Sequence, residues 1–490
     1  MSLFKFLKRN SKKYPKKAAL VINDEEYTYQ EFFKLVQNII LVLKKNKISN
    51  NNIVLLVEDN SLSHVLCLFA LSYINACIVP ASTYYSFEHL KKLAEITKVD
   101  TIISSSKYCL FFKNKLKIKN VISTNKTKKL PYLFNFTKFK NLDSKKIDTK
   151  KNYIISMSSG STGNPKPIIF SQDTKIQRFF LMKKLYNIDF RDKITLTCPL
   201  DHSLGMRILF LSVLSGATII IMNKFLPEKY INLVKKHSIT FSILVANQIY
   251  NIARDKHLLK NFHLKKGLVS ASATLNKSIK KIILKQGINL FEMYGASEIG
   301  TVTSINLKKE EKSLKSVGKI YNKFIKIGIL SKNNKILPKN KIGEIICKTP
   351  GIFKGYLGSR KINQEAFYNK FFKTGDIGYL DKKGFLYFLG RKKNIIRRSG
   401  ITIFPEDIEN ILLTDKKVKE VAVLGKQKNM SDFIYFFVKK EKNINQDYIQ
   451  KVCLKKLSTF QLPNKIFIVD SLPKSILGKT NTNKLKKYLV

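Results

Sequence analysis

The stretch Ser158-Ser159-Gly160-Ser161-Thr162-Gly163-Asn164-Pro165-Lys166 indicates the fold of this chain more directly than any other. Short apolar runs precede and follow it at 153–157 and 167–170, and each predicts a buried strand. The glycines let the backbone turn sharply and present N–H groups to an anion, while the hydroxyls add donors and Lys166 adds a positive charge. We therefore predict a loop that binds the phosphates of a nucleotide.

Two other interpretations of this loop are less favoured. A Walker A loop would need Gly-Lys followed by Ser or Thr, and Pro165 would obstruct the start of a helix there. A solvated Ser/Gly linker is the commoner explanation of such a composition. The apolar runs on both sides and the closing Pro-Lys pair argue against it.

The composition predicts a globular protein with an unusually basic surface. With 490 residues, 44% hydrophobic and 11% aromatic, the chain is long enough for two or three lobes. The formal net charge of +56 would suit a nucleic acid or an anionic membrane. Only nine of the 90 basic residues are arginine, the residue that binds phosphate or guanine bidentately. We therefore expect no specific nucleic-acid partner, and a lysine-rich surface that favours acidic partners.

Cysteine spacing and hydropathy bear on the compartment. The six cysteines show no Cys-x-x-Cys spacing, so we expect reduced thiols and a cytoplasmic protein. The best apolar run, 65–80, is broken by polar residues, so we expect no transmembrane segment. Peripheral contact with a membrane stays open. The acid-free first 23 residues would also suit a targeting peptide, but their apolar spacing favours an opening helix.

Periodicity in the first hundred residues predicts a parallel sheet. Apolar runs at 53–57, 76–80 and 101–103 read as strands, and 64–73 reads as a buried helix. A strand–helix–strand rhythm is typical of a parallel α/β sheet.

Further motifs follow the phosphate loop in order. Phe-Glu-Met-Tyr-Gly-Ala-Ser-Glu occupies 291–298, Thr-Gly-Asp occupies 374–376 with Gly390-Arg391 beyond it, and Pro-Lys-x-x-x-Gly-Lys occupies 473–479. Alone, each is more often a turn or a solvated lysine. Together, and in this order, they resemble the adenylate-forming superfamily, which includes acyl-CoA synthetases, peptide-synthetase adenylation domains and firefly-type luciferases.

The resemblance covers nearly the whole chain and implies an α/β fold. We expect a large N-terminal α/β domain, built on mostly parallel sheets, at 1–390. A small mobile α+β C-terminal domain is expected at 391–490, with the hinge near 391–393 and Lys393 at the hinge position. Gly400 falls on the loop that relatives bring to the active site for the thiol step.

The activity implied by the resemblance has two steps. A carboxylic acid attacks the α-phosphate of ATP with Mg²⁺ to give an acyl-adenylate and pyrophosphate, and a thiol then takes the acyl group. CoA is the expected thiol, and the phosphopantetheine of an acyl carrier protein is the alternative. A catalytically inactive nucleotide-binding relative is less favoured, because the motif residues are intact.

The resemblance also implies roles for individual residues. Lys479 would bridge the carboxylate and the α-phosphate, Lys166 would serve the β- and γ-phosphates, and Glu298 would hold the metal. Asp376 would accept the ribose hydroxyls, and Tyr294 would stack on adenine. The catalytic set is Lys479, His202, Lys166 and Glu298. The ATP- and AMP-binding set is Ser158, Ser159, Gly160, Ser161, Thr162, Gly163, Lys166, Ser272, Ala273, Tyr294, Gly295, Ser297, Asp376, Arg391 and Lys479.

Two departures from the family pattern concern the acid and the adenine. His202 falls on the gate of the acyl pocket, and Ser203 replaces the Asp that peptide-synthetase domains use for an α-ammonium group. We therefore expect a non-amino carboxylic acid, although Asp201, one position before the gate, leaves an amino acid open. Ala271 and Ser272 replace glycines of the adenine turn, which predicts a shifted adenine or weaker binding. The acyl-pocket set is His202, Ser203, Ala246, Asn247, Met293 and Ala296.

Overall fold

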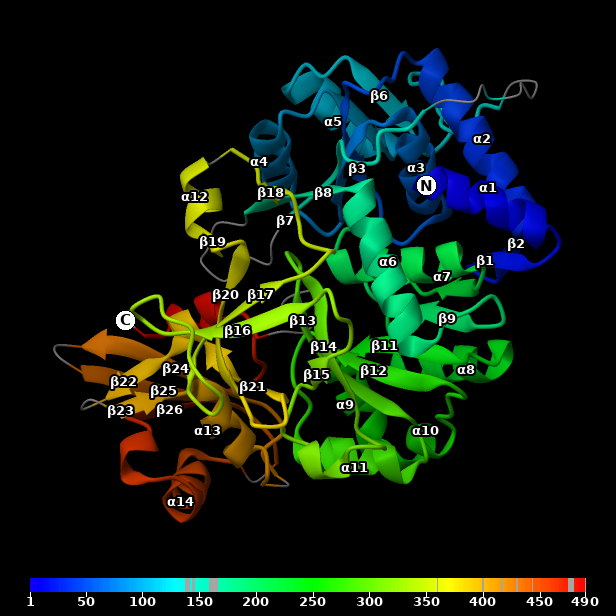
Figure 1. Cartoon of the computed structure of the whole chain (residues 1–490). Coiled ribbons are helices and arrows are strands. Elements are labelled where there is room, and N and C mark those ends of the chain that lie inside the picture. Colours follow the sequence, from blue (N-terminus) through cyan, green and yellow to red (C-terminus); the bar gives the residue numbers. More distant parts are fainter. Residues whose placement is uncertain are drawn as a thin grey trace.

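The computed structural model describes residues 1–136, 142, 146–157, 166–358, 360–398, 401–415, 417–428, 431–442, 444–474 and 480–489. Two large sheets and a smaller antiparallel one build most of the molecule, and the C-terminal residues form a separate small lobe, drawn orange to red in Figure 1. Among the described residues, no helix combines the length and the apolar character needed to cross a membrane.

The first large sheet has seven strands in the order β18-β8-β7-β4-β3-β5-β6. Pairs among β3 to β7 are parallel, whereas β7, β8 and β18 pair antiparallel. The expected strand–helix–strand rhythm is therefore confirmed. The strands are β3 (Ile53–Val57), β4 (Cys77–Ala81), β5 (Thr101–Ser104), β6 (Asn120–Ser123), β7 (Asn152–Met157), β8 (Pro167–Ser171) and β18 (Gly355–Tyr356).

The second large sheet has nine strands in the order β15-β14-β13-β12-β11-β9-β10-β1-β2. Its central strands are parallel, and antiparallel strands close both edges. The strands are β1 (Ala18–Ile22), β2 (Glu25–Thr28), β9 (Lys193–Leu196), β10 (Thr218–Ile221), β11 (Phe241–Val245), β12 (Gly267–Ala271), β13 (Leu290–Ala296), β14 (Gly300–Asn306) and β15 (Lys319–Ile320).

Helices fill three layers around these two sheets. One shared core between the sheets takes side chains from five helices, while each outer face is covered by its own cluster. The inner helices are α1 (Leu3–Lys13), α2 (Tyr29–Lys45), α3 (Leu62–Ile74), α6 (Gln172–Tyr186) and α7 (Ser203–Ser215). The outer helices are α4 (Phe87–Thr97), α5 (Ser106–Lys115), α8 (Pro227–His237), α9 (Ala246–Arg254), α10 (Lys256–Lys260) and α11 (Lys277–Lys285). The expected opening helix is present as α1.

A third, antiparallel sheet leads to the small lobe. It contains β16 (Lys326–Leu330), β17 (Gly343–Lys348), β19 (Phe367–Tyr368), β20 (Phe371–Leu380) and β21 (Leu386–Arg391). The short helices η1 (Glu311–Ser313) and α12 (Arg360–Glu365) lie before and within it. Directly after β21, a 3₁₀ turn, η2 (Lys392–Asn394), carries Lys393.

The small lobe has hydrophobic clusters of its own. Its α+β content agrees with the expected C-terminal domain, while the boundary at 390/391 stays a prediction. It contains β22 (Ile396–Arg398), β23 (Ile401–Ile403), α13 (Pro405–Leu412), β24 (Val421–Lys428), β25 (Ser431–Lys439), α14 (Gln446–Lys456), η3 (Thr459–Gln461), β26 (Lys465–Val469) and α15 (Thr482–Lys486).

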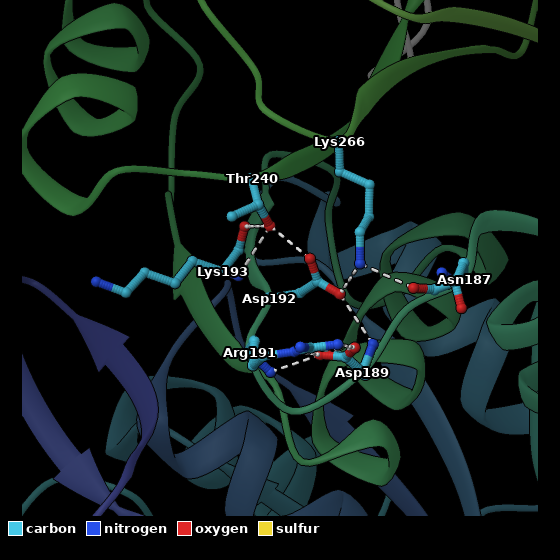
Figure 2. A network of polar contacts seen from close by, with 7 residues as sticks. All are labelled: Asn187, Asp189, Arg191, Asp192, Lys193, Thr240 and Lys266. Atoms are coloured by element: carbon cyan, nitrogen blue, oxygen red, sulfur yellow. Dashed lines mark hydrogen bonds and ion pairs between the residues drawn. The ribbon is translucent and has the colours of Figure 1, made fainter.

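A polar network joins the amino ends of three parallel strands (Figure 2). Buried Asp192 precedes β9, and its carboxylate accepts from Thr240 Oγ1 at 2.8 Å and from Lys266 Nζ at 2.5 Å. Thr240 and Lys266 directly precede β11 and β12. The network thus fixes the relative position of these strands at their amino ends. Ligand-binding sites in parallel sheets form at the other edge, outside the carboxyl ends of the strands.

Candidate active site

The carboxylate of Asp376 is held between two sheets. Asp376 on β20 stands opposite Arg391 on β21, and Arg391 Nε lies 2.9 Å from Asp376 Oδ1. Tyr294, on β13 of the nine-stranded sheet, donates its hydroxyl to Asp376 Oδ2 at 2.7 Å. Asp376 is only 3% exposed, so this carboxylate is fixed in one orientation. Burial and the charge of Asp376 raise the pKa of Tyr294, which keeps the hydroxyl a donor.

A second group joins Lys166 to Glu298 through a tyrosine. Lys166 Nζ lies 5.3 Å from the centre of the Tyr356 ring, and the Tyr356 hydroxyl donates to Glu298 Oε1 at 2.9 Å. The position follows from the fold, because β18 pairs with β8 and sets Tyr356 opposite Ile168. Tyr356 was not predicted from the sequence, because it lies far along the chain from Lys166 and Glu298 and the Gly355-Tyr356 pair matches no motif.

Arg178 organises the backbone around this site and was also missed. From α6 it donates to the carbonyl oxygens of Ser297 and Glu298, at 2.9 Å each, and to that of Gly351 at 2.7 Å. A Cβ atom on Gly351 would come within 2.7 Å of the Arg178 side chain. The available signal was an arginine directly before the apolar run 179–182. Arg178 thereby positions the Ser297–Glu298 turn against the loop that contains Gly351.

The predicted acyl-pocket residues occupy the starts of α7 and α9 and the end of β13. His202 caps α7, and its buried Nε2 has no hydrogen-bond partner within the described ranges. Arg178 Nη1 lies 3.4 Å from Ser203 Oγ. Thr197, which leads into the His202 segment, donates to Gln248 Oε1 beside Ala246 and Asn247 at 3.2 Å. Met293 and Ala296 are half-buried on β13. The assignment of this set as an acyl pocket stays a prediction.

The expected adenine turn follows β12. Ala271 is buried at the end of that strand, and Ser272 has a φ of +72°, the left-handed region that favours glycine. Glu292, which is ion-paired with buried Lys280, accepts from the Leu275 backbone N–H at 3.1 Å and holds the far end of the turn. Half-buried Ser272 and exposed Ala273 therefore lie on a supported turn at the carboxyl edge of the sheet.

Several predicted residues lie outside the described residues: Ser158, Ser159, Gly160, Ser161, Thr162, Gly163, Gly400 and Lys479. At the predicted hinge, burial and the charges of Arg391 and Lys486 lower the pKa of Lys393 to about 8. Because Lys486 belongs to α15, the last helix of the chain lies within electrostatic range of the hinge.

Two family models match the chain. The model described as AMP-binding enzyme matches residues 7–357, and that of the AMP-binding enzyme C-terminal domain matches residues 407–479.

The chain belongs to the AMP-binding enzyme family.

The family and the fold class predicted from the sequence are therefore confirmed. Among the relatives of this AMP-binding enzyme is the 2-succinylbenzoate–CoA ligase of Listeria innocua, which is 26% identical with 98% of each chain covered. Among solved structures, a similar one is O-succinylbenzoate coenzyme A synthetase from Bacillus subtilis in complex with ATP and magnesium, with a TM-score of 0.89. The two sequences are 21% identical, and the match covers 98% of this chain and 99% of the other. Another is ATP-bound MatB from Rhodopseudomonas palustris, with a TM-score of 0.89 and 20% identity, where the match covers 100% of this chain and 99% of MatB.

The structure brings five of the predicted site residues of this AMP-binding enzyme into two adjoining groups. Tyr294, Asp376 and Arg391 form one, and Lys166 and Glu298 belong to the other. Tyr294 and Glu298 stand four residues apart on one segment, which connects the groups. The individual roles predicted for these residues remain predictions.

Proposed function

We propose that this protein activates a carboxylic acid with ATP, forming an acyl-adenylate and pyrophosphate, and then transfers the acyl group to the thiol of CoA. The observation that carries the proposal is the Asp376 carboxylate fixed by Tyr294 and Arg391. A carboxylate offers about four acceptor positions, so it is suited to the hydroxyls of a ribose. The CoA-ligase names of the relatives, which match the activity predicted from the motifs, give further support.

The remaining groups suit the charges of ATP. Lys166 would bind the terminal phosphates, and its position against Tyr356 keeps it beside Glu298. Glu298 supplies the hard carboxylate oxygen that Mg²⁺ prefers, and magnesium held there would offset negative charge on the phosphates. The Arg178 contact to the Glu298 carbonyl oxygen holds the backbone of this residue in place.

The chemistry requires the protein to bring two anions together. The acid reacts as its carboxylate, which is already a nucleophile, so no general base is needed. Positioning and charge stabilisation are the main tasks. Lys166 would serve the departing pyrophosphate, and Lys479 would serve the reacting carboxylate and the α-phosphate.

The acceptor and the compartment complete the proposal. CoA is favoured over an acyl carrier protein because the relatives are named CoA ligases. A cytoplasmic location is favoured because all six cysteines are buried free thiols.

A panel of carboxylic acids tests this function. The protein is incubated with ATP, Mg²⁺ and each acid, pyrophosphate release is measured, and CoA is then added while the thioester is followed by mass spectrometry. We expect at least one acid to give both products, with adenylate accumulating when CoA is omitted. Asp376→Asn should lower both yields, whereas exposed Arg191→Met should not. ATP binding without pyrophosphate release for any acid would favour the inactive nucleotide-binding relative.

A further inference from the structure

The loop between β16 and β17, residues 331–342, combines positive charge with exposed apolar side chains. It contains no acidic residue and four lysines, at positions 332, 335, 339 and 341. In the same loop, the side chains of Ile336 and Ile342 are 56% and 55% exposed. Single exposed apolar residues are common on protein surfaces, whereas apolar side chains gathered at one exposed place mark an interaction site.

Backbone hydrogen bonds hold the loop in one shape. The Leu337 N–H donates to the Ile329 carbonyl at 2.8 Å, and the Asn340 N–H donates to the Leu380 carbonyl at 2.7 Å. Leu337 packs against the main core, so the loop does have an inward position for an apolar side chain. The two isoleucines lie outside it. Their exposure is therefore a property of the folded loop.

The same combination continues on the adjoining face of β16 and β17. Lys326 and Lys348 stand directly opposite each other in the register of these strands, and both are exposed. Gly328 is the next residue on this face, and a Cβ atom there would lie 3.5 Å from Ile336 Cδ1. Ile336 therefore lies beside the lysine pair. Like charges directly opposite on a sheet repel, and among the described residues no carboxylate is ion-paired with either lysine or with those of the loop.

Simpler explanations account for only part of these observations. Lysines occur over the whole chain, and on the edge strand β16 they would also prevent pairing with another sheet. Exposed isoleucines would work against that purpose. Non-specific binding to a nucleic acid would use the lysines alone. An anionic membrane suits both kinds of side chain, since its headgroups attract lysine and its acyl boundary takes up apolar groups.

We propose that loop 331–342 and the adjoining face of β16 and β17 bind the surface of an anionic membrane. Ile336 and Ile342 enter the boundary between headgroups and acyl chains, while the lysines lie among the headgroups. Asp376, on β20 of the same sheet, contacts Tyr294 of the nine-stranded sheet and takes no part in this surface. The inference goes beyond the function proposed above and does not depend on it.

Vesicle binding by the full chain tests the apolar part of the surface. Partition is measured by sedimentation with vesicles of phosphatidylcholine alone, and of phosphatidylcholine and phosphatidylglycerol at about 7:3, at physiological ionic strength. We expect binding to the anionic vesicles only. Ile336→Ser/Ile342→Ser keeps the charge and should bind about tenfold more weakly or worse. The matched control, Ile96→Ser/Leu454→Ser at positions 54% and 62% exposed, should bind as the wild type does.

A second pair of variants tests the charge. Lys335→Glu/Lys339→Glu should weaken partition by about 30-fold or more, because each lysine near an anionic surface contributes a factor of about five. Lys382→Glu/Lys383→Glu, in the turn at 381–384, changes the net charge equally and should lose much less. An equal loss in this control would overturn the inference, since the overall charge of the protein would then explain the binding.

Insertion has its own readout, because the chain contains no tryptophan. Ile336→Trp supplies a single reporter, whose fluorescence should shift to the blue with anionic vesicles, whereas that of Ile96→Trp should not. Vesicle-bound Ile336→Trp without a shift would overturn the inference, as would wild-type partition in Ile336→Ser/Ile342→Ser. If the wild type ignored vesicles but bound duplex DNA, and Lys335→Glu/Lys339→Glu lost that binding, the surface would belong to a nucleic acid instead.

Discussion

At the scale of single residues, the Tyr356 hydroxyl is the contact that most directly connects the two phosphate-binding side chains. Tyr356→Phe keeps the ring beside Lys166 and removes the hydrogen bond to Glu298. A hydrogen bond to a charged group contributes about 1.5–3 kcal/mol, and the half-exposed Glu298 places this one near the lower value. We expect Tyr356→Phe to weaken Mg·ATP binding about tenfold, as measured by calorimetry. Tyr356→Leu should weaken it further, and unchanged binding in the Phe variant would refute the positioning role.

Ser272 gives a second prediction at this scale. Its φ of +72° costs an L-residue about 1 kcal/mol, while glycine adopts this region without strain but loses more entropy on folding. Ser272→Gly should therefore raise the free energy of unfolding by about 0.5 kcal/mol or leave it nearly unchanged. Thr274→Gly, in the same turn but without positive φ, should lower it. Denaturant unfolding measures both, and equal destabilisation of the two variants would contradict the strain at Ser272.

How far the sequence predicted the site depends on where the partners of each residue lie. Tyr294, Asp376 and Arg391 could be named because each stands in a contiguous motif. Tyr356 and Arg178 could not, because their contacts with Glu298 and Gly351 join segments 58 to 173 residues apart and exist only after the sheets have formed. The position of Arg178 directly before the apolar run 179–182 was the signal that local reasoning could have used.

At the scale of elements, the Asp192 network fixes the amino ends of β9, β11 and β12 (Figure 2). Asp192→Ala removes a buried carboxylate and leaves the Thr240 hydroxyl and the partly exposed Lys266 ammonium without it. We expect the free energy of unfolding to fall by about 2–3 kcal/mol. Asp189→Ala, which breaks the pair with exposed Arg191, should cost less than about 1 kcal/mol. If urea unfolding gave the same loss of unfolding free energy for Asp192→Ala and Asp189→Ala, the network would not be connecting the strands.

The sequence predicted elements well where the apolar runs were long. The runs at 53–57, 76–80 and 101–103 are strands of the seven-stranded sheet, as expected. The order of the strands could not be predicted, because β8 pairs with β18 nearly 190 residues later in the chain. No local pattern encodes that pairing, yet it sets Tyr356 beside Lys166.

At the scale of the whole molecule, the turn between β21 and the small lobe is the predicted hinge. Lys393 lies in the 3₁₀ turn at 392–394, and proline there would fix φ and remove a backbone donor. We expect Lys393→Pro to impair thioester formation more than pyrophosphate release, because only the second step would require the lobe to turn. The matched control is Lys382→Pro, in the turn at 381–384, where the second position accepts proline. Equal losses of both steps in Lys393→Pro would argue against a moving lobe.

The central claim is that Asp376 holds the ribose of ATP while an acid is adenylated. ATP–pyrophosphate exchange, measured with ATP and with 2′,3′-dideoxy-ATP on wild type and Asp376→Asn, tests it most directly. We predict that the wild type loses about 10- to 100-fold in kcat/KM with the dideoxy nucleotide, as expected when charged hydrogen bonds are lost. In Asp376→Asn the two nucleotides should differ little. No exchange with any acid, or the same discrimination in wild type and variant, would contradict the account.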